Sequence, residues 1–233
     1  MSFGPLFFIG IVFTGLGMLI SFILKSKFKK YAKIQLQSNL SGKEIARKML
    51  DEHGLYDVPV TNVPGRLTDH YNPTDRTVNL SDSVYNERNA ASAAVAAHEC
   101  GHAVQHAEAY APLKMRSVLV PVQNASGMIL NVIMGIAMFG GYFLFEKFPT
   151  DIVVGILAGV YGVMALFSIV TLPVEFDASK RALAWIQNSG VVNAQEYEGS
   201  KDALKWAAMT YVVAALGAIA SLLYILTRFT GRD

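Results

Sequence analysis

Cysteine and charge are both scarce in this sequence. Cys100 is the only cysteine among 233 residues, so the chain cannot form an internal disulfide, which agrees with a protein that works in a reducing compartment. Charged residues make up 16% of the chain and leave a formal net charge of only +2. A balance so close to neutral gives no reason to expect a nucleic-acid partner. The sequence also lacks internal repeats, low-complexity segments and a phosphate-binding loop.

Hydrophobic residues, in contrast, make up 52% of the chain and include four long stretches without a charged residue. At about 1.5 Å of helical rise per residue, each stretch reaches roughly 30 Å, enough to cross the hydrocarbon core of a bilayer. The first stretch has a neutral N-terminal flank, so we expect a retained anchor and not a cleaved signal peptide. The sequence predicts a mainly α membrane protein with four transmembrane helices, at residues 1–24, 117–145, 152–172 and 206–227.

A cluster of lysines predicts how these helices are oriented. Five lysines follow the first stretch directly, and positively charged segments next to a membrane helix tend to stay in the cytoplasm. The N-terminus is then outside, and residues 25–116 and 173–205 form two cytoplasmic segments. The cluster consists of Lys25, Lys27, Lys29, Lys30 and Lys33.

One motif in the first cytoplasmic segment carries chemistry, because residues 98–102 have the zinc signature His-Glu-x-x-His. Residues four apart share one face of a helix, so His98 and His102 can hold one metal ion between their imidazoles. Glu99 then turns its carboxylate toward the metal's open side, where it can take a proton from the attacking water. The composition gives only about 0.004 such matches by chance, which disfavours two ordinary surface histidines. The Ala-rich run at residues 89–110 predicts a helix of about five or six turns, ended by Pro112.

A catalytic zinc ion usually has three protein ligands, so a third ligand is needed. The metzincin arrangement would place a histidine where this chain has Glu108 and a glycine where it has Gln105, which excludes that class. His106 shares the face of the two histidines, but about 12 Å of helix separate it from His98, too far for both to bind one ion. We expect His106 to support the site, to face substrate or to be an ordinary surface residue.

The remaining candidates for the third ligand are Glu175 and Asp177, on the same predicted side of the membrane. We expect Pro173 to break the third membrane helix, so that both acids lie at the start of a new helix. There they are about 200° apart, and only one can face the zinc helix. Arg181 lies one turn beyond Asp177 and gives it a partner, which favours Glu175 as the ligand. The simpler alternative is that both are first-turn acids stabilised by the helix dipole.

The rest of the first cytoplasmic segment predicts a small α+β domain. A capping box at residues 41–44 opens a helix that runs to about His53 and stops at Gly54. Residues 58–63, 66–71 and 77–80 are predicted strands, and the turn at residues 72–75 makes the last two a short β-hairpin before the zinc helix. A strand in that place can offer an unpaired edge to an extended peptide, or it can be purely structural; both interpretations stay open.

The chain resembles the bacterial neutral zinc metallopeptidases often called YugP-like. The resemblance covers most of the chain and is carried by two motifs, His98-Glu99-Cys100-Gly101-His102-Ala103-Val104-Gln105 and Glu175-Phe176-Asp177-Ala178-Ser179. More distantly, the chain is similar to the membrane gluzincins, which include the CAAX prenyl protease and heat-shock membrane proteases. Their third ligand lies in a Glu-aromatic-x-Ala-Asp run, which implies Glu175 here, although Ser179 replaces the final acid.

The predicted function is hydrolysis of peptide bonds by an integral-membrane zinc endopeptidase of the bacterial plasma membrane, with a cytoplasm-facing zincin-like domain. Zn²⁺ would be held by His98, His102 and Glu175, and Glu99 would act as general base and then as acid. The partners would be the lipid bilayer and a protein or peptide substrate in or near it. The alternative is a non-catalytic zinc-stabilised scaffold or transporter, but a structural site normally has four protein ligands and no use for Glu99. An intramembrane protease would need its zinc helix inside an apolar span, whereas charged residues flank this one.

Overall fold

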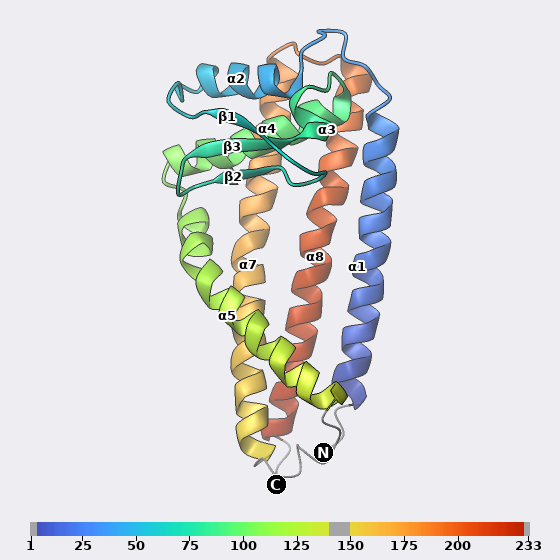
Figure 1. The fold of residues 1–233 in the computed structure, drawn as a ribbon, viewed down its shortest axis with the longest axis vertical. Helices are drawn as coiled ribbons and strands as arrows, with labels where there is room; N and C mark the ends of the chain where they lie inside the picture. The colour runs from blue at the N-terminus through green and yellow to red at the C-terminus, as the bar shows by residue number, and fades with distance from the viewer. Residues whose placement is uncertain (1–3, 140–149, 231–233) are drawn as a thin grey trace. The chain divides into compact units, whose positions relative to one another are not determined.

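The computed structural model describes residues 4–139 and 150–230, which are mainly helical with one small sheet (Figure 1). The chain divides into two compact units. Unit 1 takes in the described residues of Met1–Leu19, Met115–Leu172 and Tyr211–Asp233, and unit 2 consists of Ile20–Lys114 and Pro173–Thr210. Among the described residues, four long helices contribute to both units: α1 (Gly4–Tyr31), α5 (Ala111–Phe139), α7 (Thr150–Asn188) and α8 (Ala194–Thr230).

Each of these four helices is long and apolar enough to cross a membrane. The predicted apolar segments therefore lie within longer helices that are candidate membrane spans. The first three residues of the predicted segment 1–24 and the end of the predicted segment 117–145 lie outside the described residues. Many large apolar side chains of unit 1 are exposed, among them Phe8 at 65% and Met128 at 69%. So much exposed apolar surface is what lipid-facing helices require. The candidate spans are Gly4–Tyr31, Ala111–Ile136, Asp151–Asn188 and Ala194–Arg228.

Helix α7 continues through Pro173, so the prediction that this proline breaks the helix is wrong. Proline removes one backbone N–H and crowds the carbonyl of the preceding turn, but membrane helices tolerate it where neighbouring groups compensate. Glu175 and Asp177 consequently lie well inside α7 and not in a first turn. The helix dipole therefore does not explain these two acids.

Unit 2 contains a three-stranded sheet of β1 (Val60–Val63), β2 (His70–Asn72) and β3 (Thr77–Ser81), in the order β1-β3-β2. β3 pairs in parallel with β1 and antiparallel with β2. The strand that comes last before the zinc motif is therefore central, and the free edges belong to β1 and β2. β2 is shorter than the predicted strand because Gly65 and Leu67 have φ angles of 109° and 57°, which no extended strand allows.

Side-chain caps begin the two helices that cover this sheet. α2 (Gly42–Glu52) opens with the predicted capping box at Ser41. α4 (Ala90–Ala107), which carries the zinc motif, begins at Asn89, whose side chain accepts the N–H of Ser92. These bonds satisfy backbone donors that a helix start otherwise leaves unpaired.

The zinc-motif helix α4 ends slightly earlier than the sequence predicted. Ala109 adopts a left-handed φ of 54°, and the N–H of Tyr110 donates to the carbonyl of Gln105 at 2.9 Å. This is the pattern of a Schellman turn, which satisfies the last carbonyls of a helix. Helix α5 begins directly afterwards, with Pro112 in its first turn.

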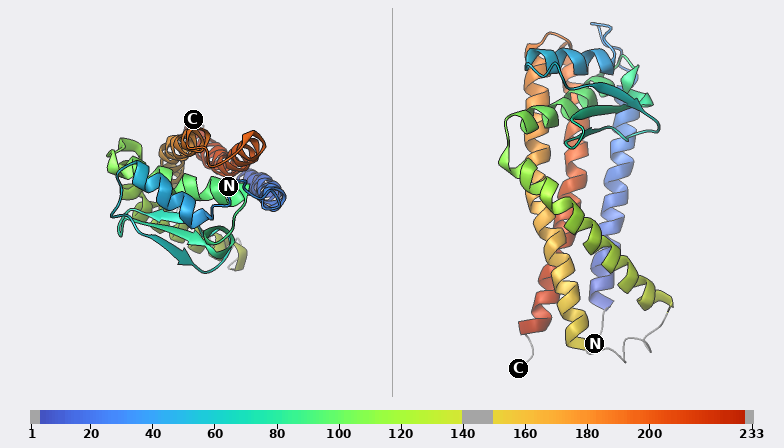
Figure 2. Two further views of the ribbon diagram at one scale, coloured as in Figure 1. Left: turned by 90° about the horizontal axis from the view of Figure 1, so that it is seen from above. Right: turned by 60° about the vertical axis from the view of Figure 1, so that its left-hand side comes forward.

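α2 and α4 lie together on one face of the sheet (Figure 2). Val78 and Leu80, at alternate positions of β3, are fully buried, because residues two apart on a strand point to the same face. Ile45, Met49 and Leu50 of α2 are also fully buried and belong to the same hydrophobic core. This core fixes the position of α4, and with it the zinc motif.

Candidate metal centre

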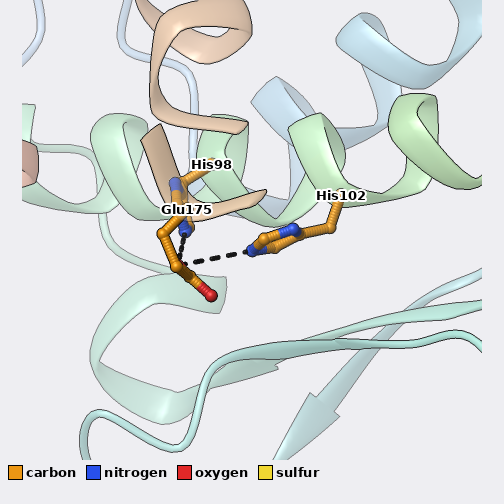
Figure 3. A group of neighbouring side chains, drawn as sticks. All are labelled: His98, His102 and Glu175. Atoms are coloured by element: carbon orange, nitrogen blue, oxygen red, sulfur yellow. Dashed lines mark ion pairs between the residues drawn. The ribbon is translucent and has the colours of Figure 1, made fainter. Parts of the chain in front are cut away.

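α4 presents two histidines one helical turn apart, and both face a glutamate of α7 (Figure 3). The rings of His98 and His102 have centroids 4.8 Å apart. Oε2 of Glu175 lies 3.3 Å from Nε2 of His98 and 3.7 Å from Nε2 of His102. One ligand atom from each residue lies within 4.8 Å of the others. The structure thus brings together the three residues that the sequence predicted as ligands, all within unit 2.

The spacing and chemistry of these atoms fit a zinc ion. In a tetrahedral site with bonds of about 2.0–2.2 Å, two ligand atoms lie roughly 3.3 Å apart, close to the 3.3 and 3.7 Å observed. The side chain of Glu175 is only 3% exposed, and a buried carboxylate is costly without a cation. Two imidazoles and one carboxylate would supply three of the four ligands of Zn²⁺, which is the number typical of catalytic sites.

Each histidine is also held from behind, at its Nδ1 atom. The hydroxyl of Ser179 lies 3.1 Å from Nδ1 of His98, and the side-chain oxygen of Gln105 lies 3.0 Å from Nδ1 of His102. Both oxygens can accept a proton carried on Nδ1. That tautomer leaves Nε2 with its lone pair available to a metal.

Gln105 is fully buried and ties α4 to α7. Its amide nitrogen donates to the carbonyl of Val174 at 2.8 Å and to Oδ2 of Asp177 at 2.9 Å. Asp177 also accepts the Nε–H of Arg181 at 2.5 Å, as the i, i+4 spacing predicted. Asp177 is therefore outside the group of ligand atoms. It positions Gln105, which in turn positions His102.

α4 and α7 touch through their backbones between the two histidines. A Cβ atom at Gly101 would lie 2.6 Å from the carbonyl oxygen of Ala178 and 3.1 Å from its Cα. Backbone atoms cannot rotate aside as a flexible side chain can, so only glycine allows this approach. The close contact brings Glu175 and Ser179, which flank Ala178 on α7, within reach of the histidines.

Glu99, the second residue of the motif, is 8% exposed and binds the backbone of β2. Its Oε2 accepts the N–H of Tyr71 at 2.9 Å. Burial raises the pKa of Glu99 to about 7; the adjacent His98 opposes this shift, and the negative charge of Glu175 adds to it. A carboxyl group with a pKa near neutrality can both accept and release a proton at physiological pH.

Comparison with known proteins shows the family to which the chain belongs. The profile of the family described as "Putative neutral zinc metallopeptidase" matches residues 6–230. The chain belongs to this family. The "Putative membrane protease YugP" of Bacillus subtilis (strain 168) is 42% identical over 228 residues, covering 97% of each chain. No solved structure matches the chain. With its four apolar helices, this member of the metallopeptidase family is a multi-pass membrane protein.

Three supporting residues of the candidate metal centre had no such role assigned from the sequence. Ser179 departs from the gluzincin pattern, and its i+4 spacing predicts that it shares one face of the helix with Glu175, but the sequence does not show that it meets His98. Gln105 had one signal, its i+3 spacing from His102. Tyr71 had none, because its bond to Glu99 depends on how the sheet packs against α4.

Proposed function

We propose that the chain is a zinc-dependent endopeptidase of the gluzincin type, which hydrolyses peptide bonds of membrane or membrane-proximal proteins. The observation that carries the proposal is the convergence of His98, His102 and Glu175, with Glu99 fixed beside them. Bound Zn²⁺ would supply Lewis-acid chemistry, polarising a carbonyl group and making water more acidic. A purely structural site would need a fourth protein ligand, and the group found among the described residues has three.

Glu99 would carry the proton in this reaction. It would take a proton from the attacking water and then pass it to the nitrogen of the leaving amine. The N–H of Tyr71 would hold one carboxylate oxygen in place and leave the other to handle the proton. Ser179 and Gln105 would keep His98 and His102 in the ligating orientation.

The proposed enzyme can be tested directly on the purified full-length chain in detergent. With one equivalent of zinc it should cleave an unfolded protein such as casein, lose activity on treatment with a chelator, and regain it when zinc is added back. Peptide products are identified by mass spectrometry. A fully zinc-loaded protein that cleaves neither casein nor a peptide mixture would favour the scaffold or transporter instead.

We propose that the substrate binds as an extended strand along the outer edge of β2. The backbone N–H of Val78, in β3, donates to the carbonyl of Pro59 and so points toward β1. Val78 is opposite Tyr71 of β2, and the two therefore form a non-hydrogen-bonded pair. In such a pair the N–H and C=O of Tyr71 point away from β3, toward the outer edge of β2. The Tyr71 carbonyl is an acceptor of the kind that added strands use.

N-methylation of a substrate peptide tests this edge without disturbing the protein. Because an added strand uses every second backbone N–H, a methyl group at one position near the cleaved bond should raise KM about tenfold, the cost of one lost hydrogen bond. The same methyl group one residue along should have little effect. Equal increases in KM for methyl groups at neighbouring positions would rule out strand addition. KM values equal to that of the unmethylated peptide at every position would rule it out as well.

We propose that unit 2 faces the cytoplasm, which is supported by the lysines that follow the first apolar stretch. Single cysteines at Lys43 or Gln195, both exposed in unit 2, should then resist a membrane-impermeant thiol reagent applied to intact cells. A cysteine at Thr150 should be labelled. Permeabilised cells, in which all three should react, provide the control. Labelling at Lys43 in intact cells would place the site on the outer face.

A further inference from the structure

His106 lies on the same face of α4 as His98 and His102, one turn beyond the second of them. It is not a member of the ligand group within the described residues. At about 1.5 Å of rise per residue, His106 is about 9 Å along the helix axis from the midpoint between His98 and His102. At that distance His106 cannot contact the carbonyl that is cleaved at the metal, but it can contact another residue of the same extended peptide.

The ring of His106 is held by the side chain of Tyr71, the residue whose backbone binds Glu99. The Tyr71 hydroxyl lies 2.7 Å from Nδ1 of His106, and the two rings meet edge to face with centroids 5.8 Å apart. Burial raises the pKa of the Tyr71 phenol, so it keeps its proton and can donate it to Nδ1. The ring proton of neutral His106 is then on Nε2, which becomes a hydrogen-bond donor. No partner of Nε2 is found among the residues described.

Two cations act electrostatically on the ring of His106. The charges of Arg76, in the turn before β3, and Lys114, in the first turn of α5, add to burial in lowering the pKa of His106. Neither has an ion-pair partner in the described part of the chain. Glu108, two residues after His106, pairs with Arg181 at 2.7 Å, and Asp75 accepts the Asn72 amide at 2.8 Å. The charge of a third acid, Asp57, acts on Tyr71. The surroundings of His106 therefore favour an anionic ligand.

We infer that His106, Arg76 and Lys114 form a subsite that binds an acidic side chain of the peptide substrate. This inference rests on the proposed peptidase function and names a preference of that same site. An extended chain advances about 3.3 Å per residue, so the 9 Å of helix place the acidic residue two or three positions from the cleaved bond. Tyr71 is a positioning residue, because it fixes the tautomer in which His106 donates.

A peptide mixture of known sequences, digested with the zinc-loaded full-length protein, tests the preference. Mass spectrometry of the products gives the residues around each cleaved bond. Aspartate and glutamate should be enriched at one position, two or three residues from that bond. A synthetic peptide with Glu there should then have a KM about tenfold lower than its Gln counterpart, the size of one charge-assisted hydrogen bond, with kcat within about twofold.

Variants assign the preference to these residues. His106→Ala and Arg76→Gln should each reduce the ratio of KM values for the Gln and Glu peptides toward one, with zinc content and kcat on the Gln peptide kept. Tyr71→Phe, which retains the ring and the backbone N–H, should weaken the preference in the same direction. His53→Ala and Arg66→Gln are matched controls. His53 is exposed and its ring bonds the carbonyl of Met49 in α2, so both controls should keep the wild-type ratio.

The outcomes separate this subsite from the proposed enzyme. Absence of cleavage by the zinc-loaded wild type would overturn the peptidase proposal itself. Cleavage without an acidic preference, or a preference that His106→Ala and Arg76→Gln leave unchanged, would overturn the subsite while leaving the peptidase intact. Loss of zinc from the His106→Ala protein would also contradict the subsite, since it would assign His106 to the metal.

Discussion

Replacing Glu99 with glutamine should leave zinc bound and lower kcat by about three orders of magnitude, which is within the range for removal of a general acid–base group. The amide has nearly the same shape and can still accept the N–H of Tyr71, which is 2.9 Å away in the wild type. It cannot take a proton from water at neutral pH. The ligands His98 and His102 are untouched, so metal content should remain at one equivalent.

Metal analysis and steady-state kinetics on the same purified sample decide this prediction. Glu198→Gln is a matched control, because the side chain of Glu198 is exposed and its ion pair with Lys201 is long, at 3.8 Å. The Glu198→Gln protein should retain full activity. His98→Ala should instead lose the zinc itself. Undiminished turnover in the Glu99→Gln protein would exclude this residue as the proton carrier. Loss of zinc from the Glu99→Gln protein would instead show that Glu99 is needed to hold the metal.

Replacing Glu175 with alanine should reduce zinc affinity by orders of magnitude, because two histidines alone hold Zn²⁺ poorly. Its Oε2 is the atom that both Nε2 atoms face, at 3.3 and 3.7 Å. Asp177→Ala should cost no more than about 10- to 100-fold, the usual effect of a group that supports a metal ligand. Asp177 accepts a hydrogen bond from Gln105 at 2.9 Å, and Gln105 in turn contacts His102. The effect of Asp177 on the metal site is therefore indirect.

Competition with a chelator of known zinc affinity measures both variants. Glu175→Asp offers a further comparison, since it keeps the charge but shortens the reach, and it should lie between wild type and Glu175→Ala. Circular dichroism confirms that each variant is folded. If Asp177→Ala loses its zinc while Glu175→Ala retains a full equivalent, Glu175 is not the third ligand.

The helix that carries the zinc motif and the capping box of α2 were predictable because their signals are local. The box at Ser41 and the end of α2 near Gly54 depend on residues a few positions apart, and the structure has both. The His98 and His102 pair follows from helical periodicity alone. Four apolar helices likewise follow from composition and length. Each of these features is decided within one element of the chain.

Pro173 and the order of the strands could not be predicted in this way. Proline disfavours a helix interior by about 3 kcal/mol in isolation, yet α7 runs through Pro173 because its packing and its apolar setting outweigh that preference. The central place of β3 depends on β1, which pairs with it across the intervening loop and strand. Strand order is a long-range property, whereas turn sequences such as the one at Asn72 specify only neighbouring strands.

The residues that hold the metal ligands in place could not be predicted for the same reason. Gln105 meets Val174 and Asp177 only because α4 and α7 approach closely at Gly101. The glycine occupies one of the two unspecified positions of the zinc signature, so the motif alone does not assign it a role. Its importance appears only once the carbonyl of Ala178 is seen opposite it, 2.6 Å from where a Cβ would stand.

The contact between α4 and α7 also bears on when the protein becomes active during its synthesis. A ribosome completes His98 and His102 well before it reaches Glu175 and Ser179, because the whole of α5 and about the first two thirds of α7 are made in between. Until that later segment has emerged and docked at Gly101, the nascent chain has only two of the three proposed metal ligands. A growing or truncated chain should therefore hold zinc poorly. The proposed peptidase activity is therefore postponed until the second and third of the four candidate spans have been made.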